Sequence, residues 1–141
     1  MADEMINFES MPEALYLIAC WRRQWSNGGA ISGRLPRYLI EKLGAKRIAS
    51  MSQDVANLCY PFQVAGTHDS FRPVAAYQDG LPTDPMHREN YFYDAGNGLI
   101  IFLGEEPWSR IDLYGQAFFH AVQELGIKKP CLLYTSPSPR D

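Results

Sequence analysis

The sequence predicts an α/β fold of three layers, in which helices cover both faces of a mostly parallel central sheet. Two continuous apolar runs, residues 14–19 and 99–103, have the length and composition of strands that are buried on both faces. Each run is followed along the chain by apolar residues at helical spacing. Buried strands that alternate with amphipathic helices indicate a sheet between two helical layers. The strand-rich segment 62–94 should add an antiparallel extension to that sheet.

The composition is that of one globular domain: 141 residues, of which 46% are hydrophobic and 21% charged, with a formal net charge of −3. The basic residues form no stripe, which argues against nucleic-acid binding. The acidic residues 1–4 do not begin a secretory signal, and the apolar run 14–20 is too short to cross a bilayer. Cys20 and Cys59 lack metal-ligand spacing and should be buried, reduced thiols. These observations predict a cytoplasmic protein with no metal, cofactor, nucleic-acid partner or membrane partner.

We predict that residues 131–141 are not native to the protein. Their sequence is Cys-Leu-Leu-Tyr-Thr-Ser-Pro-Ser-Pro-Arg-Asp, and every residue fits one reading frame of the transposon end and adapter used to prepare sequencing libraries. The alternative is an ordinary disordered Ser/Pro-rich terminus. We expect residues 1–130 to be the N-terminal part of a single α/β domain and residues 131–141 to be translated adapter. Synonymous codons that depart from the adapter would contradict this expectation.

The first strand is predicted at residues 13–20, and the helix after it ends near Leu43. Apolar residues recur at every fourth position from Ile31 to Leu43, and Gly44 follows as a C-terminal cap. Pro36 leaves the beginning of this helix open. The helix either begins just before the proline, which then lies in its first turn, or begins earlier and kinks.

The middle of the chain is expected to hold short strands and turns. Segment 52–59 is ambiguous, and a single helical turn is one option. Strands are predicted at 47–51, 62–64, 71–77, 90–94 and 99–103, and turns at 79–85 and 96–98.

The last helix is clearly marked in the sequence. Ser109 should cap its beginning, with Asp112 three residues later, as in a capping box. An apolar stripe continues as far as Leu125, and Gly126 ends the helix. Residues 127–130 then lead into what should be another central strand.

The first strand-to-helix turn carries candidate ligand-binding or partner-binding residues. Gly28, Gly29 and Gly33 lie where doubly wound folds often bind phosphate, because the amides of the helix N-terminus point towards the ligand. Their spacing matches neither a P-loop nor a dinucleotide-binding motif, so tight packing of the helix on the sheet is the alternative. Trp25 and Asn27 lie in the same turn and are candidates with them.

Glu105, Glu106 and Trp108 form the second set of candidates. They follow the clearest predicted strand, and such folds place their sites in loops at the carboxyl ends of parallel strands. Two adjacent carboxylates could bind a metal or act as acid and base, whereas a solvated turn that favours the next helix N-terminus is the alternative. The tryptophan could line a pocket or a partner surface, or cap the core. We predict no catalytic residue, because the sequence has no Gly-x-Ser-x-Gly elbow and neither Cys20 nor Cys59 has an evident histidine partner.

Several segments, taken in order, are typical of one known family. They are Leu-Ile-Ala at 17–19, Gly-Gly-Ala at 28–30, Tyr-Leu-Ile-Glu-Lys-Leu-Gly-Ala-Lys-Arg at 38–47, Asn-Tyr-Phe-Tyr at 90–93, Leu-Ile-Ile-Phe-Leu-Gly-Glu-Glu-Pro at 99–107 and Glu-Leu-Gly-Ile at 124–127. This set resembles the proteasome assembly chaperone 2 family, in its bacterial or archaeal form, from about residue 13 to residue 130. Two features depart from the family: residues 20–25 are bulky and basic where relatives are glycine-rich, and relatives are longer.

The resemblance implies an α/β/α sheet of the phosphorylase/hydrolase-like type, incomplete at its C-terminal end. It implies assembly-chaperone activity for archaeal and eukaryotic relatives, whereas bacterial members mostly have no assigned activity. The expected function is a non-enzymatic protein-interaction or assembly-chaperone-like role. Proteasome subunits or homologous chaperone subunits are the expected partners, and the full-length protein should be a homo-oligomer. The alternative is a small-molecule-binding or hydrolytic enzyme with a site at the sheet's carboxyl end.

Overall fold

The computed structural model describes residues 5–22, 31–60, 77–79, 81–82 and 88–133. Within these ranges, six strands form one sheet in the order β1-β3-β6-β7-β2-β8, and β4 pairs with β5 in a separate hairpin. The strands of the sheet are β1 (Ile6–Phe8), β2 (Tyr16–Arg22), β3 (Lys46–Met51), β6 (Tyr91–Asp94), β7 (Leu99–Glu105) and β8 (Lys129–Leu133). The hairpin consists of β4 (Tyr77–Gln78) and β5 (Leu81–Pro82), and the helices are α1 (Ile31–Leu43), α2 (Gln53–Cys59) and α3 (Ile111–Glu124).

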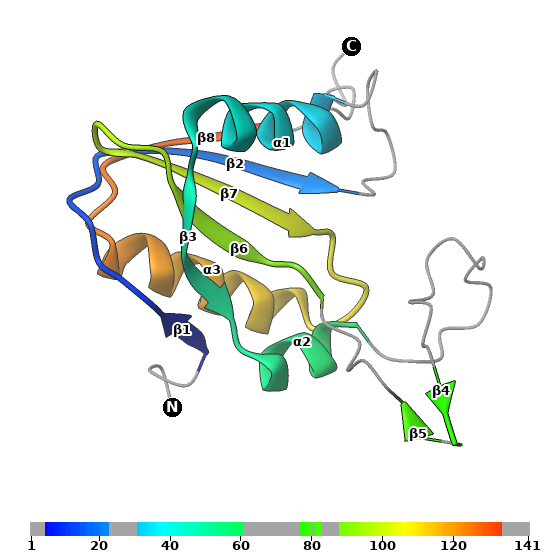
Figure 1. The fold of residues 1–141 in the computed structure, drawn as a ribbon. Helices are drawn as coiled ribbons and strands as arrows, with labels where there is room; N and C mark the ends of the chain where they lie inside the picture. Colours follow the sequence, from blue (N-terminus) through cyan, green and yellow to red (C-terminus); the bar gives the residue numbers. More distant parts are fainter. Residues whose placement is uncertain (1–4, 23–30, 61–76, 80, 83–87, 134–141) are drawn as a thin grey trace, which may run out of the picture.

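Most strands of the sheet run in one direction. β2 is parallel to both β7 and β8, whereas β6 is antiparallel to β7 and to β3, and β1 is antiparallel to β3. β2, β3, β7 and β8 therefore share a direction, and β1 and β6 oppose it. Helix α1 lies on one face of the sheet, and α2 and α3 lie on the other (Figure 1). This is the predicted three-layer architecture with an antiparallel element.

Aromatic side chains fill the core between the sheet and α3. The centroid of the Phe102 ring lies 4.6 Å from that of Phe92 and 5.0 Å from that of Phe118, and all three side chains are buried. Side chains alternate between the two faces of a strand. Tyr91 and Tyr93, which flank Phe92 in β6, therefore face the α1 side of the sheet, where their rings lie 6.3 Å apart.

The two central strands extend two residues beyond their predicted ends. β2 continues past Cys20 to Arg22, and β7 continues past Leu103 to Glu105. The added residues are partners in the parallel register. β2 and β7 remain paired as far as Arg22 and Glu105 because these two side chains carry opposite charges. Glu105 therefore belongs to the strand and not to the loop in which the sequence places it.

Helix α1 settles the alternatives left open by the proline. It spans Ile31–Leu43 with Pro36 inside it, so the earlier of the two possible starts is correct. Gly44 follows the helix with a left-handed φ of 60°, as predicted. The ambiguous segment 52–59 forms α2, and the Ser52 hydroxyl caps it by accepting a hydrogen bond from the Val55 N–H.

The prediction that Ser109 caps the last helix is wrong. The N-cap residue of α3 is Arg110, which has a left-handed φ of 46° and makes no side-chain capping bond. Its guanidinium donates to the Asp112 carboxylate instead, through two contacts of 3.1 Å. The Ser109 N–H donates to the Cys59 carbonyl at 3.1 Å. This contact with the end of α2 fixes the backbone just before α3. Gly126 follows the helix with a φ of 70°, as predicted.

The two outer strands of the described sheet differ in how well the sequence predicts them. β1 is three residues long and was not expected. β8 forms where a further strand is predicted, and it pairs in parallel with β2 at one edge, where Leu132 is 50% exposed. The predicted strand 62–64 and nearly all of 71–77 lie outside the described residues.

Candidate functional site

Two buried strands end in opposite charges at one edge of the sheet. Arg22 ends β2 and Glu105 ends β7. Glu105 Oε1 lies 3.3 Å from Arg22 Nη2, and Glu105 Oε2 lies 2.7 Å from Arg88 Nη1. Arg22 Nη2 also lies 2.7 Å from Glu89 Oε2. The Arg88 and Glu105 side chains are each 9% exposed. The Glu105 carboxylate is therefore held between two guanidinium groups with little access to water.

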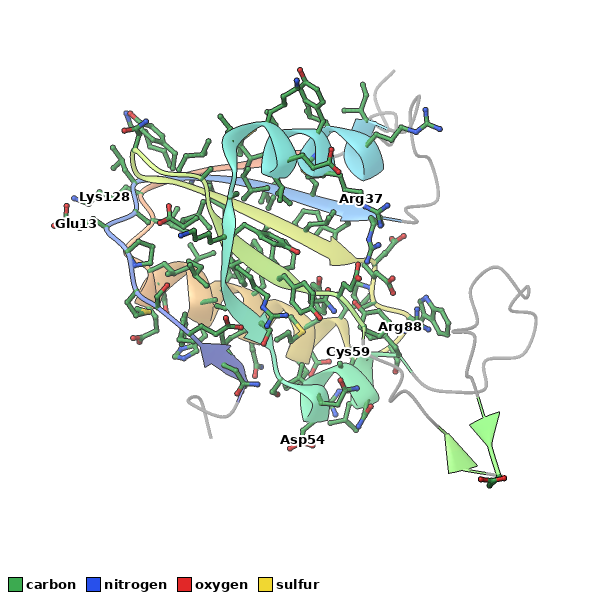
Figure 2. The ribbon with its side chains drawn as sticks, in the orientation of Figure 1. Glu13, Arg37, Asp54, Cys59, Arg88 and Lys128 are labelled. Carbon is green, nitrogen blue, oxygen red and sulfur yellow. The ribbon has the colours of Figure 1, made fainter. Side chains whose placement is uncertain are left out.

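Aromatic rings hold Arg88 in place alongside Glu105. The guanidinium carbon of Arg88 lies 5.2 Å from the centroid of the Tyr60 ring and 4.8 Å from that of Trp108. The two rings meet edge to face, 6.2 Å apart. The backbone N–H of Trp108 donates to the Cys59 carbonyl at 3.0 Å, which ties the backbone at Trp108 to the end of α2. Figure 2 shows Arg88 and Cys59 at the same corner of the molecule. Cation–π contacts of this kind favour one fixed position of the arginine.

A buried asparagine connects the charged cluster to the core on the α3 side. Asn90 is fully buried, and its Oδ1 accepts hydrogen bonds from the Tyr114 hydroxyl at 2.8 Å and from the Glu105 N–H at 3.1 Å. The Tyr60 hydroxyl donates to the Glu105 carbonyl at 2.5 Å. Trp21 Nε1 donates to the Tyr114 hydroxyl at 2.9 Å. These bonds join β2, β7, α3 and the end of α2, so the backbone of Glu105 is fixed from the α3 side of the sheet.

Gly104 makes room for this network. A Cβ at this position would lie 2.7 Å from the Tyr114 hydroxyl oxygen and 2.7 Å from two atoms of the Phe102 ring. These distances are well inside van der Waals contact. The glycine before Glu105 is therefore needed for α3 to pack directly on the end of β7.

Hydroxyl and thiol groups near the cluster are held in their protonated forms. Burial raises the pKa of the Tyr60 and Tyr114 hydroxyls above the ordinary value. It also raises the pKa of the Cys59 thiol to about 11 and the pKa of the Cys20 thiol to about 12. The thiolate is the nucleophilic form of cysteine, so neither thiol is activated. Among the described residues, no three His, Cys, Asp or Glu side chains gather into a metal site.

Among the described residues, two buried donors of the cluster have no hydrogen-bond acceptor. They are Arg22 Nε and Asn90 Nδ2. The orientation of the Asn90 amide is fixed because its Oδ1 must accept from the Glu105 N–H. A buried donor without a partner costs about 1–3 kcal/mol. The cluster can therefore offer hydrogen bonds to an acceptor, in a region where the opposite charges are already paired.

The structure brings two of the predicted site residues into this cluster. Glu105 is buried at its centre, and Trp108 packs against Tyr60 and Arg88. Glu106 is exposed, so the two adjacent carboxylates occupy different environments. Gly33 lies in the first turn of α1, apart from these contacts. The other candidates lie outside the described residues: Trp25, Asn27, Gly28 and Gly29.

The sequence patterns miss most of the cluster, namely Arg22, Tyr60, Arg88, Asn90 and Tyr114. Arg22 could have been identified from the sequence. It follows the apolar run 14–19, and the oppositely charged Glu105 follows the run 99–103, which is predicted to form another buried strand. The others come from the end of α2, from the residues before β6 and from α3. Tertiary packing alone brings them together, so local patterns carry no trace of the contact.

The fold and the cluster define an α/β/α protein with a buried polar network at the carboxyl ends of its parallel strands. Comparison with known protein families identifies one family within this class. The PAC2 family pattern matches residues 25–141, and the chain belongs to the PAC2 family. The resemblance seen in the sequence is thereby confirmed. No curated protein matches the chain.

Two of the solved structures that share the fold show how far the similarity extends. One is a proteasome-assembly chaperone homologue from Mycobacterium tuberculosis, with a TM-score of 0.65 and 15% identity, and the match covers 84% of this chain and 48% of that one. The other is a protein of unknown function from Corynebacterium glutamicum, with a TM-score of 0.64 and 18% identity, and the match covers 92% of this chain and 50% of that one. The matched region is thus about half the length of either structure. In the described part of the chain, no helix has the length and apolar character needed to span a bilayer.

Proposed function

We propose that this chain is part of a non-enzymatic, assembly-chaperone-like protein that acts by binding other proteins. Membership of the PAC2 family carries the proposal, and the fold shared with a proteasome-assembly chaperone homologue supports it. Proteasome subunits or homologous chaperone subunits are the proposed partners. The full-length protein acts in the cytoplasm and forms a homo-oligomer.

The chemistry of the charged cluster fits a recognition role better than a catalytic one. Glu105 accepts hydrogen bonds from two arginines, and a carboxylate engaged in this way is a poor general base. The nearby thiols of Cys20 and Cys59 have raised pKa values and are not activated as nucleophiles. The cluster supplies a rigid corner that can orient a binding surface, built from β2, the end of α2, the residues before β6, β7 and α3.

Co-expression tests this function. The full-length protein is produced together with the α and β proteasome subunits of its host, and the mixture is separated by size-exclusion chromatography. We expect the protein to elute with α or β subunits, and native mass spectrometry then gives the stoichiometry. An unrelated α/β protein of similar size from the same host is the control. Elution of the protein separately from all proteasome subunits would count against the proposal.

A second candidate function is that of a small-molecule-binding or hydrolytic enzyme with a site at the sheet's carboxyl end. The two buried donors without acceptors, Arg22 Nε and Asn90 Nδ2, favour it because a ligand oxygen would satisfy them. Thermal-shift measurements with nucleotides and phosphorylated metabolites test this function. A ligand at about 100 times its Kd should stabilise the fold by about 2.7 kcal/mol. The absence of a shift across the panel would remove this candidate.

A further inference from the structure

The turn between β6 and β7 places an Asn-Gly pair at the surface. The Leu99 N–H donates to the Gly96 carbonyl at 3.0 Å across this turn. Between them, Asn97 has a φ of 53° and Gly98 a φ of 77°, and positive values at both central positions are typical of a type I′ turn. Asn97 is exposed and Gly98 is partly exposed. The turn lies at the beginning of β7, at the end of the sheet opposite the charged cluster (Figure 1).

An asparagine that is followed by glycine can react with its own backbone. The amide nitrogen of the second residue attacks the side-chain carbonyl carbon of the asparagine and closes a five-membered ring. A side chain on the second residue hinders this attack, but Gly98 has no Cβ. In the described part of the chain, neither the Asn97 side chain nor the Gly98 N–H makes a hydrogen bond. No hydrogen bond therefore holds the two reacting groups apart.

We propose that Asn97 is a site of spontaneous deamidation, and that isoaspartate at this position loosens the contact between the β6–β7 turn and the start of β2. The Gly98 nitrogen forms a bond to Asn97 Cγ, the Cγ–Nδ2 bond breaks, and the Gly98 proton leaves with the side-chain amino group as ammonia. The resulting succinimide ring takes up one water. Opening of the ring at the Asn97 backbone carbonyl gives isoaspartate, and opening at Cγ gives aspartate. The reaction needs no enzyme, cofactor or partner.

The folded turn offers little resistance to ring closure. The ring fixes the backbone of Asn97 in a conformation other than that of a type I′ turn, so the Asn97–Gly98 peptide must rotate first. Glycine can follow this rotation because it is free of Cβ clashes. The local cost is the hydrogen bond between the Leu99 N–H and the Gly96 carbonyl, which lies at the surface. Loss of one such bond should slow the reaction by no more than about tenfold relative to an unstructured chain.

The product matters because this turn anchors the start of β2. The Gly98 carbonyl accepts hydrogen bonds from the Leu15 N–H at 2.8 Å and from the Tyr16 N–H at 2.9 Å. The Leu15 carbonyl in turn accepts from the N–H groups of Lys128 and Lys129, at 3.0 Å each. The same point therefore connects the starts of β2, β7 and β8. Isoaspartate adds one methylene carbon to the main chain directly before Gly98, which displaces its carbonyl and deprives the two N–H groups of their acceptor.

Peptide mapping of aged protein tests the site. The full-length protein is incubated at mildly alkaline pH, and samples taken over time are digested with trypsin. Cleavage after Arg88 and Arg110 releases one peptide that contains both Asn90 and Asn97, whereas Asn27, which also precedes a glycine, is released on a different peptide. Mass spectrometry measures the gain of about 1 Da, and electron-transfer fragmentation distinguishes isoaspartate from aspartate. Asn90 is the internal control, because it is fully buried and is followed by tyrosine.

We expect Asn97 to deamidate at a rate within about tenfold of that of a free peptide with the sequence of residues 94–100. The rate should rise with pH, because the attacking nitrogen must lose its proton, and Asn90 should stay intact over the same period. A rate at Asn97 that is more than about tenfold below that of the free peptide overturns the proposal. Equal modification of Asn90 and Asn97 also overturns it, because the folded turn would then confer no selectivity.

Hydrogen–deuterium exchange tests the effect on the fold. In aged wild-type protein that carries isoaspartate at position 97, the amides of Leu15 and Tyr16 should exchange about threefold or more faster than in fresh protein. Asn97→Gly is the matched control, because glycine tolerates the left-handed conformation and cannot close the ring. Fresh and aged samples of this variant should agree within about twofold. A smaller change in wild type, or the same change in Asn97→Gly, overturns the proposed loosening.

Discussion

Glu105→Gln removes the negative charge between Arg22 and Arg88 while keeping the size of the side chain. Arg22 retains its contact with Glu89 at 2.7 Å, so the loss falls mainly on the 2.7 Å contact between Glu105 and Arg88. Both of these side chains are 9% exposed, so solvent screens the contact little. Removing one partner of a buried ion pair costs about 3–5 kcal/mol. Because the glutamine oxygen can still accept one hydrogen bond, we expect a loss of about 3 kcal/mol.

Urea unfolding measures this loss, followed by the fluorescence of Trp21 and Trp108, which lie at the cluster. With an m-value of about 2 kcal/mol/M, the midpoint should fall by about 1.5 M. Glu106→Gln is the matched control, because this neighbour is exposed, and it should change the stability by less than about 0.5 kcal/mol. An unchanged midpoint for Glu105→Gln, or equal shifts for the two variants, would refute the buried ion-pair cluster.

Three further predictions concern packing, the asparagine network and pH. Gly104→Ala should destabilise the fold by about 1–3 kcal/mol through overpacking, whereas Gly115→Ala, whose new Cβ meets nothing within 4 Å, should stabilise α3 by up to about 1 kcal/mol; thermal melts that give both variants the same sign would contradict this packing. Asn90→Ala leaves two buried donors without their acceptor and should cost about 2–4 kcal/mol in urea unfolding; a cost below about 0.5 kcal/mol would show that the network is open to water. The pKa values of the Cys20 and Cys59 thiols rise from 9.0 to about 12 and about 11 on folding, so the unfolded chain releases these protons first and stability should fall as the pH rises above about 9. Each thiol contributes about 1.4 kcal/mol per pH unit in that range, and Cys20→Ala should flatten the dependence; an identical pH profile for this variant would contradict the burial.

The strands of the core could be predicted because their burial is visible in the local sequence. Residues 99–103 are all apolar, and so they read as a strand covered on both faces. The end of that strand could not be predicted in the same way. Glu105 belongs to β7 because Arg88 and Arg22, which are 17 and 83 residues away in sequence, neutralise its charge. No local pattern shows that compensation.

The beginning of α3 shows the same limit. The capping-box motif at Ser109 is present in the sequence, but the Trp108 and Ser109 N–H groups both donate to the Cys59 carbonyl, at 3.0 and 3.1 Å. The chain therefore enters the helix through a left-handed Arg110. A tertiary contact with α2 has overridden a valid local signal.

The predicted origin of residues 131–141 stays a prediction. β8 spans residues 129–133 and pairs with β2 through the backbone, which most residue types can do. The formation of this strand therefore does not distinguish native residues from translated adapter. The nucleotide sequence does: codons identical to the adapter would support the prediction, and synonymous departures would contradict it.

Sedimentation of the full-length protein with purified proteasome α subunits of its host tests most directly whether it binds proteasome subunits. We predict a complex that sediments faster than either component. Separate sedimentation of the two components at micromolar concentrations would contradict the proposed function.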